Sequence, residues 1–168
     1  MKEAAVSKQA GLVALVLVAL TGCASGGGGR VGSSGARPAT TAARVSCQDS
    51  PEIAARAEAA RSAAREGRYD EALRVAEEVL QACAAQPVAV AALGQALVEM
   101  GRLDEAIARL TAVLQANPDL GYAYYWRGKA YNARQQTARM VDDLEAFLRL
   151  LPNAPEAAAV QQLLSAIK

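Results

Sequence analysis

Few residues in this chain of 168 could do chemistry, and cysteine is the most informative type among them. Cys23, Cys47 and Cys83 are the three cysteines, and histidine is absent, so the commonest general base and metal ligand at neutral pH is missing. The cysteines lack the C-x-x-C spacing typical of redox-active pairs, and a zinc site needs more ligands than two thiols. The sequence therefore predicts no metal site and no cofactor.

Acidic residues form the other group that could act in catalysis. Asp142, Asp143 and Glu145 lie close together, and so do Asp104 and Glu105. Both groups fall where a helix is expected to face solvent, and no nucleophile is paired with a base. We interpret them as surface carboxylates and expect no catalytic residues and no enzyme activity. An enzyme stays as the minor alternative, which measurable hydrolytic or redox turnover would favour.

Composition and charge narrow the fold and the partners. Helix-forming Ala, Leu, Glu and Arg are frequent and strand-forming residues are scarce, which predicts an all-α fold. The formal net charge is only +1, whereas a nucleic-acid-binding surface needs a clustered basic excess. We expect no nucleic-acid partner and no small-molecule substrate.

The N-terminal segment has the pattern of an export signal. Lys2 and Lys8 precede an apolar run at 11–20, which is too short for a membrane-spanning helix of about 20 residues. The alternative, a buried core helix, has no partner nearby. Leu20-Thr21-Gly22-Cys23 resembles the lipobox of bacterial lipoproteins, which implies that 1–22 is a signal peptide and that Cys23 becomes the lipidated mature N-terminus. Because Ala24 follows, the resemblance implies an outer-membrane anchor facing the periplasm.

The segment that follows Cys23 is rich in Gly, Ser, Thr and Pro. It cannot bury enough apolar surface to offset the entropy cost of ordering it. We expect 23–46 to be a flexible tether with a reach of roughly 25 Å.

The rest of the chain repeats with a period of 34 residues. Five of seven residues are identical between 67–73 and 101–107, and the same offset relates Gly94 to Gly128 and Pro118 to Pro152. In these residues the chain resembles the tetratricopeptide repeat family, whose unit is two antiparallel helices. The resemblance departs at Gln135 and Met140, where a turn glycine and a small alanine are expected.

The resemblance implies an all-α solenoid over 47–168. It places three helix-turn-helix repeats at about 53–86, 87–120 and 121–154, and a capping helix at 155–167. Seven helices are expected near 52–66, 69–83, 87–100, 103–116, 120–134, 137–150 and 155–167.

The cysteines at the two ends of the first hairpin are candidates for a bond. In an antiparallel hairpin the start of the first helix and the end of the second are neighbours, which brings Cys47 close to Cys83. In an oxidising compartment we expect a disulfide there. The alternative is two unrelated thiols.

The candidate binding residues follow from the family, whose first helices line a concave groove. The matching positions, expected to bind a protein or peptide partner, are Tyr122, Tyr125, Trp126, Lys129, Asn132, Gln95 and Val98. Exposed Tyr and Trp are frequent at binding surfaces, although packing against a neighbouring helix is the alternative for Tyr125 and Trp126. The positions that clamp acidic chaperone tails in the family hold Ala57, Arg61, Ala92, Tyr122 and Trp126, so that clamp is not expected.

The function expected from these features is a membrane-anchored periplasmic scaffold or adaptor for an envelope complex. The alternative is a structural envelope lipoprotein or accessory subunit that binds through its convex face.

Overall fold

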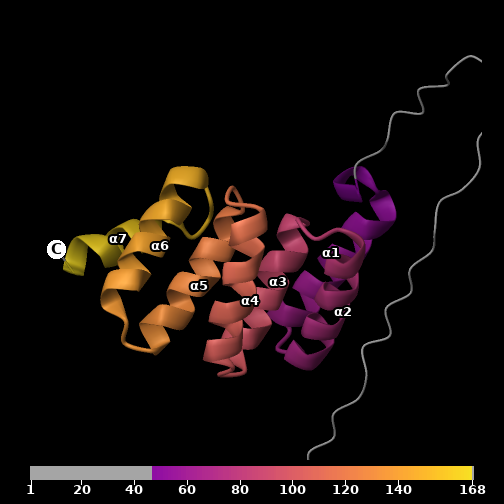
Figure 1. The fold of residues 1–168 in the computed structure, drawn as a ribbon, viewed down its shortest axis with the longest axis horizontal. Helices are drawn as coiled ribbons and strands as arrows, with labels where there is room; N and C mark the ends of the chain where they lie inside the picture. Colours follow the sequence, from indigo (N-terminus) through magenta and orange to yellow (C-terminus); the bar gives the residue numbers. More distant parts are fainter. Residues whose placement is uncertain (1–46, 168) are drawn as a thin grey trace, which may run out of the picture. The chain divides into compact units, whose positions relative to one another are not determined.

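The computed structural model describes residues 47–167, which belong to one compact unit, Thr41–Lys168. The expected signal peptide 1–22, Cys23 and the tether 23–46 lie outside the described residues. The described chain is helical without strands (Figure 1). Its elements are η1 (Cys47–Asp49), α1 (Pro51–Arg65), α2 (Tyr69–Ala82), α3 (Pro87–Glu99), α4 (Leu103–Ala116), α5 (Gly121–Ala133), α6 (Thr137–Leu150) and α7 (Ala157–Ile167).

Local sequence signals explain where several helices begin and end. Ser50 and Gln86 are the N-caps of α1 and α3, each followed by a proline whose fixed backbone suits a first helical turn. The Gln86 side chain accepts a hydrogen bond from the backbone N–H of Ala89 at 2.8 Å. Gly67 and Gly101 end α1 and α3 in the left-handed conformation, with φ of 78° and 73°.

The third hairpin makes the same turn without glycine. Gln135 follows α5 with a φ of 59°, so it takes the conformation that Gly67 and Gly101 take in the other two hairpins. A residue with a side chain adopts this conformation at a cost of about 1–3 kcal/mol, which the packing of α5 on α6 must offset.

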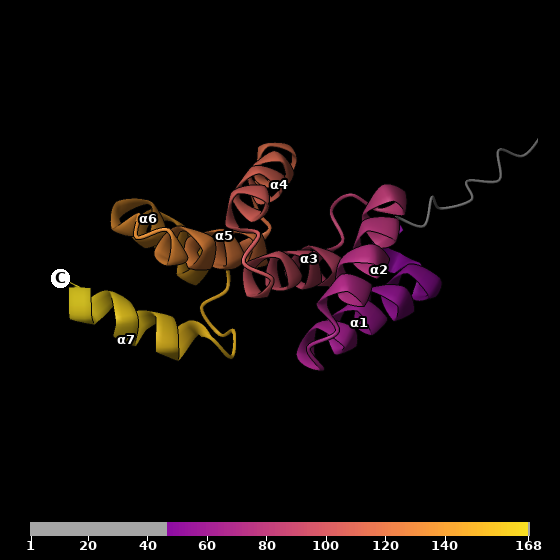
Figure 2. The same ribbon diagram turned by 90° about the horizontal axis from the view of Figure 1, so that it is seen from below.

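The helices form three stacked hairpins, α1–α2, α3–α4 and α5–α6. Along the stack α1 packs on α3 and α3 packs on α5. Figure 2 shows α2, α4 and α6 on one side, with α1 and α7 on either side of α3 and α5 on the other. The first helices of the hairpins therefore form a concave face, and the all-α fold of three helix-turn-helix units with a C-terminal capping helix is confirmed.

Small side chains allow this close stacking. The buried residues of α1 are all alanines, namely Ala57, Ala60, Ala63 and Ala64. At the other end, α7 buries Val160 and Leu164 against α6, in a cluster with Met140, Leu144 and Phe147. The helix α7 thus covers the apolar surface that the third hairpin leaves open.

None of the helices within 47–167 combines the length and apolar character needed to cross a membrane.

One close approach between helices depends on Gly94. A Cβ atom added there would lie 2.6 Å from the Cβ and 2.8 Å from the Cγ of Trp126, on the neighbouring hairpin. We expect Gly94→Ala to lower the free energy of unfolding by about 1–3 kcal/mol, because α5 must move away and alanine's better helix propensity offsets only about 1 kcal/mol. Chemical denaturation monitored by circular dichroism measures the change.

Gly128→Ala is the matched control for this prediction. Its Cβ would meet the mobile end of Leu144 at 3.1 Å, which needs a smaller adjustment. Equal losses for the two variants would show that the contact with Trp126 is not what makes Gly94 sensitive.

Candidate functional site

A groove of about 160 Å³ lies on the concave face of the first helices. It is lined from α1 by Arg61 and Arg65, from α3 by Pro87, Val88, Ala91, Ala92 and Gln95, from α5 by Tyr122 and Trp126, and by Glu156 before α7. Three of the residues expected to bind a partner, Tyr122, Trp126 and Gln95, lie together here. The groove can surround an extended segment with apolar and aromatic side chains.

The groove differs in charge between its two ends. Arg61 forms an ion pair with Glu58, and within the described residues Arg65 has no ion-pair partner. On the α7 side, the Tyr122 hydroxyl donates a hydrogen bond to Glu156 Oε2 at 3.0 Å. Burial, and then this hydrogen bond, raises the pKa of Tyr122, so its hydroxyl stays a neutral donor at physiological pH. The groove is thus cationic toward α1 and anionic toward α7.

Tyr125 lies outside this groove, in an aromatic cluster. Its ring centroid is 5.0 Å from that of the buried Phe147, 5.1 Å from that of Trp126 and 6.3 Å from that of Tyr122. Burial raises the pKa of the Tyr125 phenol. Tyr125 therefore supports the neighbouring aromatic rings from the interior side, which is the packing alternative that its sequence position left open.

A second cavity, of about 410 Å³, separates α5 from α7 and holds the remaining residues expected on α5. Tyr125, Lys129 and Asn132 line it, because their spacing of four and then three residues puts them on one stripe of α5. The presence of α7 beside α5 turns this stripe away from the concave groove. Val98 lines neither cavity and packs against the main hydrophobic cluster.

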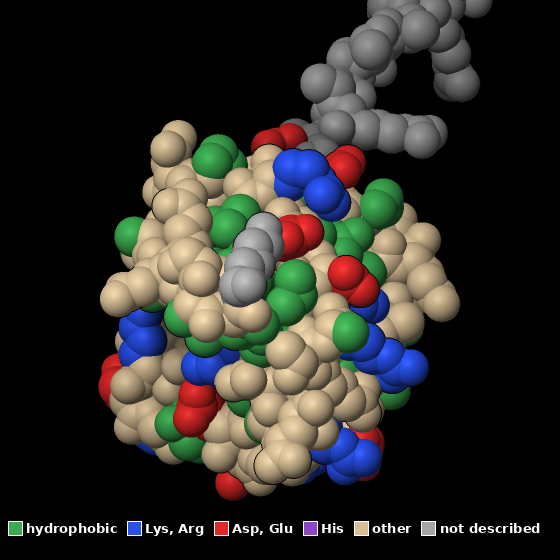
Figure 3. All heavy atoms as spheres, turned by 90° about the vertical axis from the view of Figure 1, so that its left-hand side faces the viewer, with side chains coloured by type: hydrophobic (Ala, Val, Ile, Leu, Met, Phe, Trp, Pro, Cys, Tyr) green, Lys and Arg blue, Asp and Glu red, His purple; other side chains and the backbone are tan. Residues whose placement is uncertain are grey.

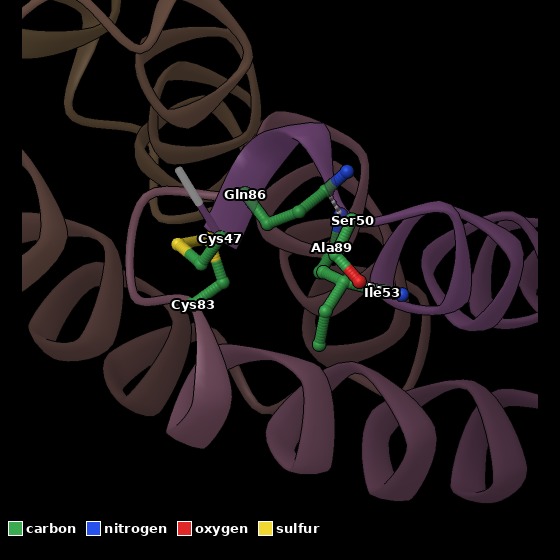
Figure 4. Close-up of a disulfide and its surroundings, with 6 residues drawn as sticks. All are labelled: Cys47, Ser50, Ile53, Cys83, Gln86 and Ala89. Atoms are coloured by element: carbon green, nitrogen blue, oxygen red, sulfur yellow. Dashed lines mark hydrogen bonds between the residues drawn. A yellow bond between two sulfur atoms is a disulfide. The ribbon is translucent and has the colours of Figure 1, made fainter. Parts of the chain in front are cut away.

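The N-terminal hairpin carries the cysteine pair expected from the sequence. Cys47 and Cys83 are joined by a disulfide, with their Cα atoms 5.5 Å apart (Figure 4). The bond ties η1 to the α2–α3 connection next to the Gln86 cap. It fixes the α1 end of the groove to α3.

The acidic residues are not the surface cluster that the sequence indicated. Asp143 is buried, and both its oxygens accept hydrogen bonds from Arg127, at 2.8 and 2.7 Å. Arg127 also donates to Thr111 Oγ1 at 3.0 Å, and its guanidinium lies 5.6 Å from the Tyr124 ring. The hydrogen bonds to Asp143 raise the pKa of Arg127, so the pair stays charged.

A sequence signal could have located Asp143 in the interior. It falls on the stripe of Met140, Leu144 and Phe147, at the helical spacing of buried positions. The expectation of a solvent-exposed Asp143 was wrong because a buried arginine compensates its charge. Asp104 and Glu105 are paired with Arg134 and Arg102, and 47–167 contains no group of three or more acidic or cysteine side chains arranged to hold a metal.

Comparisons with known proteins agree with this geometry. Two family models described as tetratricopeptide repeat match residues 63–130 and 122–154. No curated protein sequence matches the chain.

Several solved structures share the fold. The first TPR of Spaghetti (RPAP3), bound to the HSP90 peptide SRMEEVD, has a TM-score of 0.59 at 24% identity, covering 68% of this chain and 94% of that one. The type III secretion translocator chaperone SycD of Yersinia enterocolitica has a TM-score of 0.60 at 19% identity, with coverages of 70% and 92%. The OM64 TPR domain of Arabidopsis has a TM-score of 0.58 at 17% identity, with coverages of 69% and 96%.

Proposed function

Because the chain belongs to the tetratricopeptide-repeat family, we propose that it is a protein-interaction adaptor that binds a segment of a partner in its concave groove. The observation that carries this proposal is the groove itself, which brings Tyr122, Trp126 and Gln95 from two hairpins to one surface. Aromatic side chains at the centre of such a surface contribute much of the binding free energy in protein interfaces.

The chemistry of the groove favours a partner segment with apolar or aromatic side chains. The first TPR of Spaghetti (RPAP3) is solved with the HSP90 peptide SRMEEVD, which is acidic near its end. At the positions that the family uses to clamp such tails, this chain has one cation, Arg61, and Glu58 already pairs with it. The apolar surface of Val88, Ala91 and Trp126 is better matched to an apolar segment that places one acidic group near Arg65.

The second part of the proposal concerns location. We propose that Cys23 is lipidated after removal of 1–22, and that 23–46 tethers the domain to the periplasmic side of the outer membrane. The support is the order of the sequence features, with a basic start, the apolar run at 11–20 and then Leu20-Thr21-Gly22-Cys23. The adaptor would then serve the assembly of an envelope complex.

Lipidation gives a direct prediction for Cys23→Ala. Without the thiol that receives the lipid, we expect the chain to keep 1–22, whereas the wild-type chain should begin at an acylated Cys23. Mass spectrometry of the membrane fraction measures both. Cleavage at another position, or a wild-type chain that retains Met1, would contradict the lipoprotein proposal without affecting the groove.

The groove is tested by crosslinking in cells from a photoreactive residue placed at Gln95. Gln95 lies in the groove, and Ala108 is a matched control on the exposed side of α4. We expect a partner to crosslink from position 95 and not from 108, and Tyr122→Ala to reduce that crosslink. Crosslinking from 108 alone would favour the second candidate, a structural lipoprotein or accessory subunit bound through the convex face.

A further inference from the structure

The interface between the second and third hairpins is filled by an aromatic side chain. Trp126 of α5 lies directly on Gly94 of α3, so closely that no Cβ would fit between them. The indole occupies the space that the missing side chain of Gly94 leaves open. A glycine on one first helix and a tryptophan on the next therefore form one packing unit.

One period later the glycine is present but the tryptophan is not. The offset of 34 residues relates Gly94 to Gly128 and Trp126 to Val160. The three atoms nearest to a Cβ added at Gly128 all belong to α6, whereas at Gly94 all three belong to Trp126. Within the described chain, α7 packs on α6 but has no packing on α5 like that of α3 on α5.

The result is the cleft of about 410 Å³ between α5 and α7. Its floor is apolar and includes Gly128, Met140, Leu144 and Val160, while Lys129 and Asn132 lie on its polar rim. An apolar cavity of roughly 150 Å³ is already enough to bind benzene in a protein interior. The cleft is therefore large enough for an aromatic ring together with part of its backbone.

The cleft is continuous with the concave groove. Glu156 lines both cavities, and the Tyr125 ring lies between the cleft and the groove residues Tyr122 and Trp126. Figure 3 faces this end of the molecule, where hydrophobic side chains are interspersed with few charged ones. Leu163 and Ile167, which are 41% and 43% exposed, extend the apolar surface along α7.

From this geometry we propose that the α5–α7 cleft binds an aromatic side chain of the partner segment, in place of the tryptophan that the fourth first helix lacks. The inference rests on the proposed function, because the segment in the groove delivers the side chain. Lys129, whose Nζ is 4.8 Å from the Trp126 ring centroid, can make a cation–π contact with an incoming ring in the same way.

N-acetyl-tryptophanamide is a suitable probe, because it carries the indole without a partner's other groups. In a heteronuclear NMR titration of the full chain, we expect saturable shifts at the Gly128 amide and none at Gly94, where Trp126 already fills the space. Val160→Trp should abolish these shifts and raise the midpoint of thermal unfolding by about 3 °C or more. Val90→Trp, at a fully buried position, is the matched control and should lower the midpoint.

Absence of a saturable response at Gly128, or a response that a folded Val160→Trp variant retains, would overturn the proposal. If Val160→Trp does not fold, Ala159→Trp fills the cleft from an exposed position and replaces it in the same comparison. Shifts at Gly128 that follow protein concentration without probe would also overturn it, by showing a second copy of the chain in the cleft. Because the probe needs no partner, crosslinking at Gln95 can fail while the cleft still binds, or the reverse.

Discussion

Replacing Asp143 by alanine is expected to lower the free energy of unfolding by about 3–5 kcal/mol, which is the usual cost of removing one partner of a buried ion pair. Asp143 is buried on α6, and Arg127 of α5 donates to both its oxygens. Without the carboxylate, the guanidinium keeps only Thr111 and the Tyr124 and Tyr131 rings as partners. Urea denaturation followed by circular dichroism measures the loss.

Two further variants separate the charge effect from simple truncation. Asp142→Ala removes an adjacent but exposed carboxylate and should change stability by less than about 0.5 kcal/mol. The double variant Arg127→Met/Asp143→Leu replaces the pair by apolar side chains and should be more stable than Asp143→Ala. If Asp143→Ala is as stable as Asp142→Ala, the ion pair does not hold α5 and α6 together.

Loss of the Cys47–Cys83 disulfide is expected to cost about 3–4 kcal/mol, because the bond closes a loop with a sequence separation of 36 and so restricts the unfolded chain. The first hairpin depends on this bond, since α1 buries only alanines and contributes little apolar surface. We expect reduction of the wild-type chain to lower the midpoint of denaturation while the helical content of the folded state stays the same.

The double variant Cys47→Ala/Cys83→Ala is the control for this measurement. It should have the stability of the reduced wild-type chain and should not respond to reductant. A wild-type chain with freely labelled thiols at both positions in non-reducing buffer would contradict the prediction.

The fold was predictable from the sequence because its determinants are local and repeated. Gly67 and Gly101 mark turns that need a left-handed residue, and Pro51 and Pro87 mark first turns of helices. The period of 34 residues then relates each helix to its equivalent in the next hairpin. Even Gln135, which breaks the pattern, takes the conformation that the period assigns to it.

The candidate site was predictable only in part, because side chains on one helix face separate according to what packs beside them. Tyr122 and Trp126 line the groove, whereas Tyr125, Lys129 and Asn132 face the cleft next to α7. That division depends on where α7 lies, which is set by Val160 and Leu164 packing on α6. The buried pair of Arg127 and Asp143 joins two helices at a distance of 16 residues in sequence, so no local pattern reveals the partner of either residue.

The disulfide also determines how the domain bears mechanical tension. A pulling force transmitted along the backbone reaches Cys47 and passes through the sulfur atoms to Cys83, so that α1 and α2 lie outside the loaded path. Roughly 120 Å of extended chain is thereby prevented from unravelling. If the N-terminal segment is anchored to a membrane, movements of that membrane pull directly on the α2–α3 connection, and the terminal hairpin stays folded until the bond is reduced.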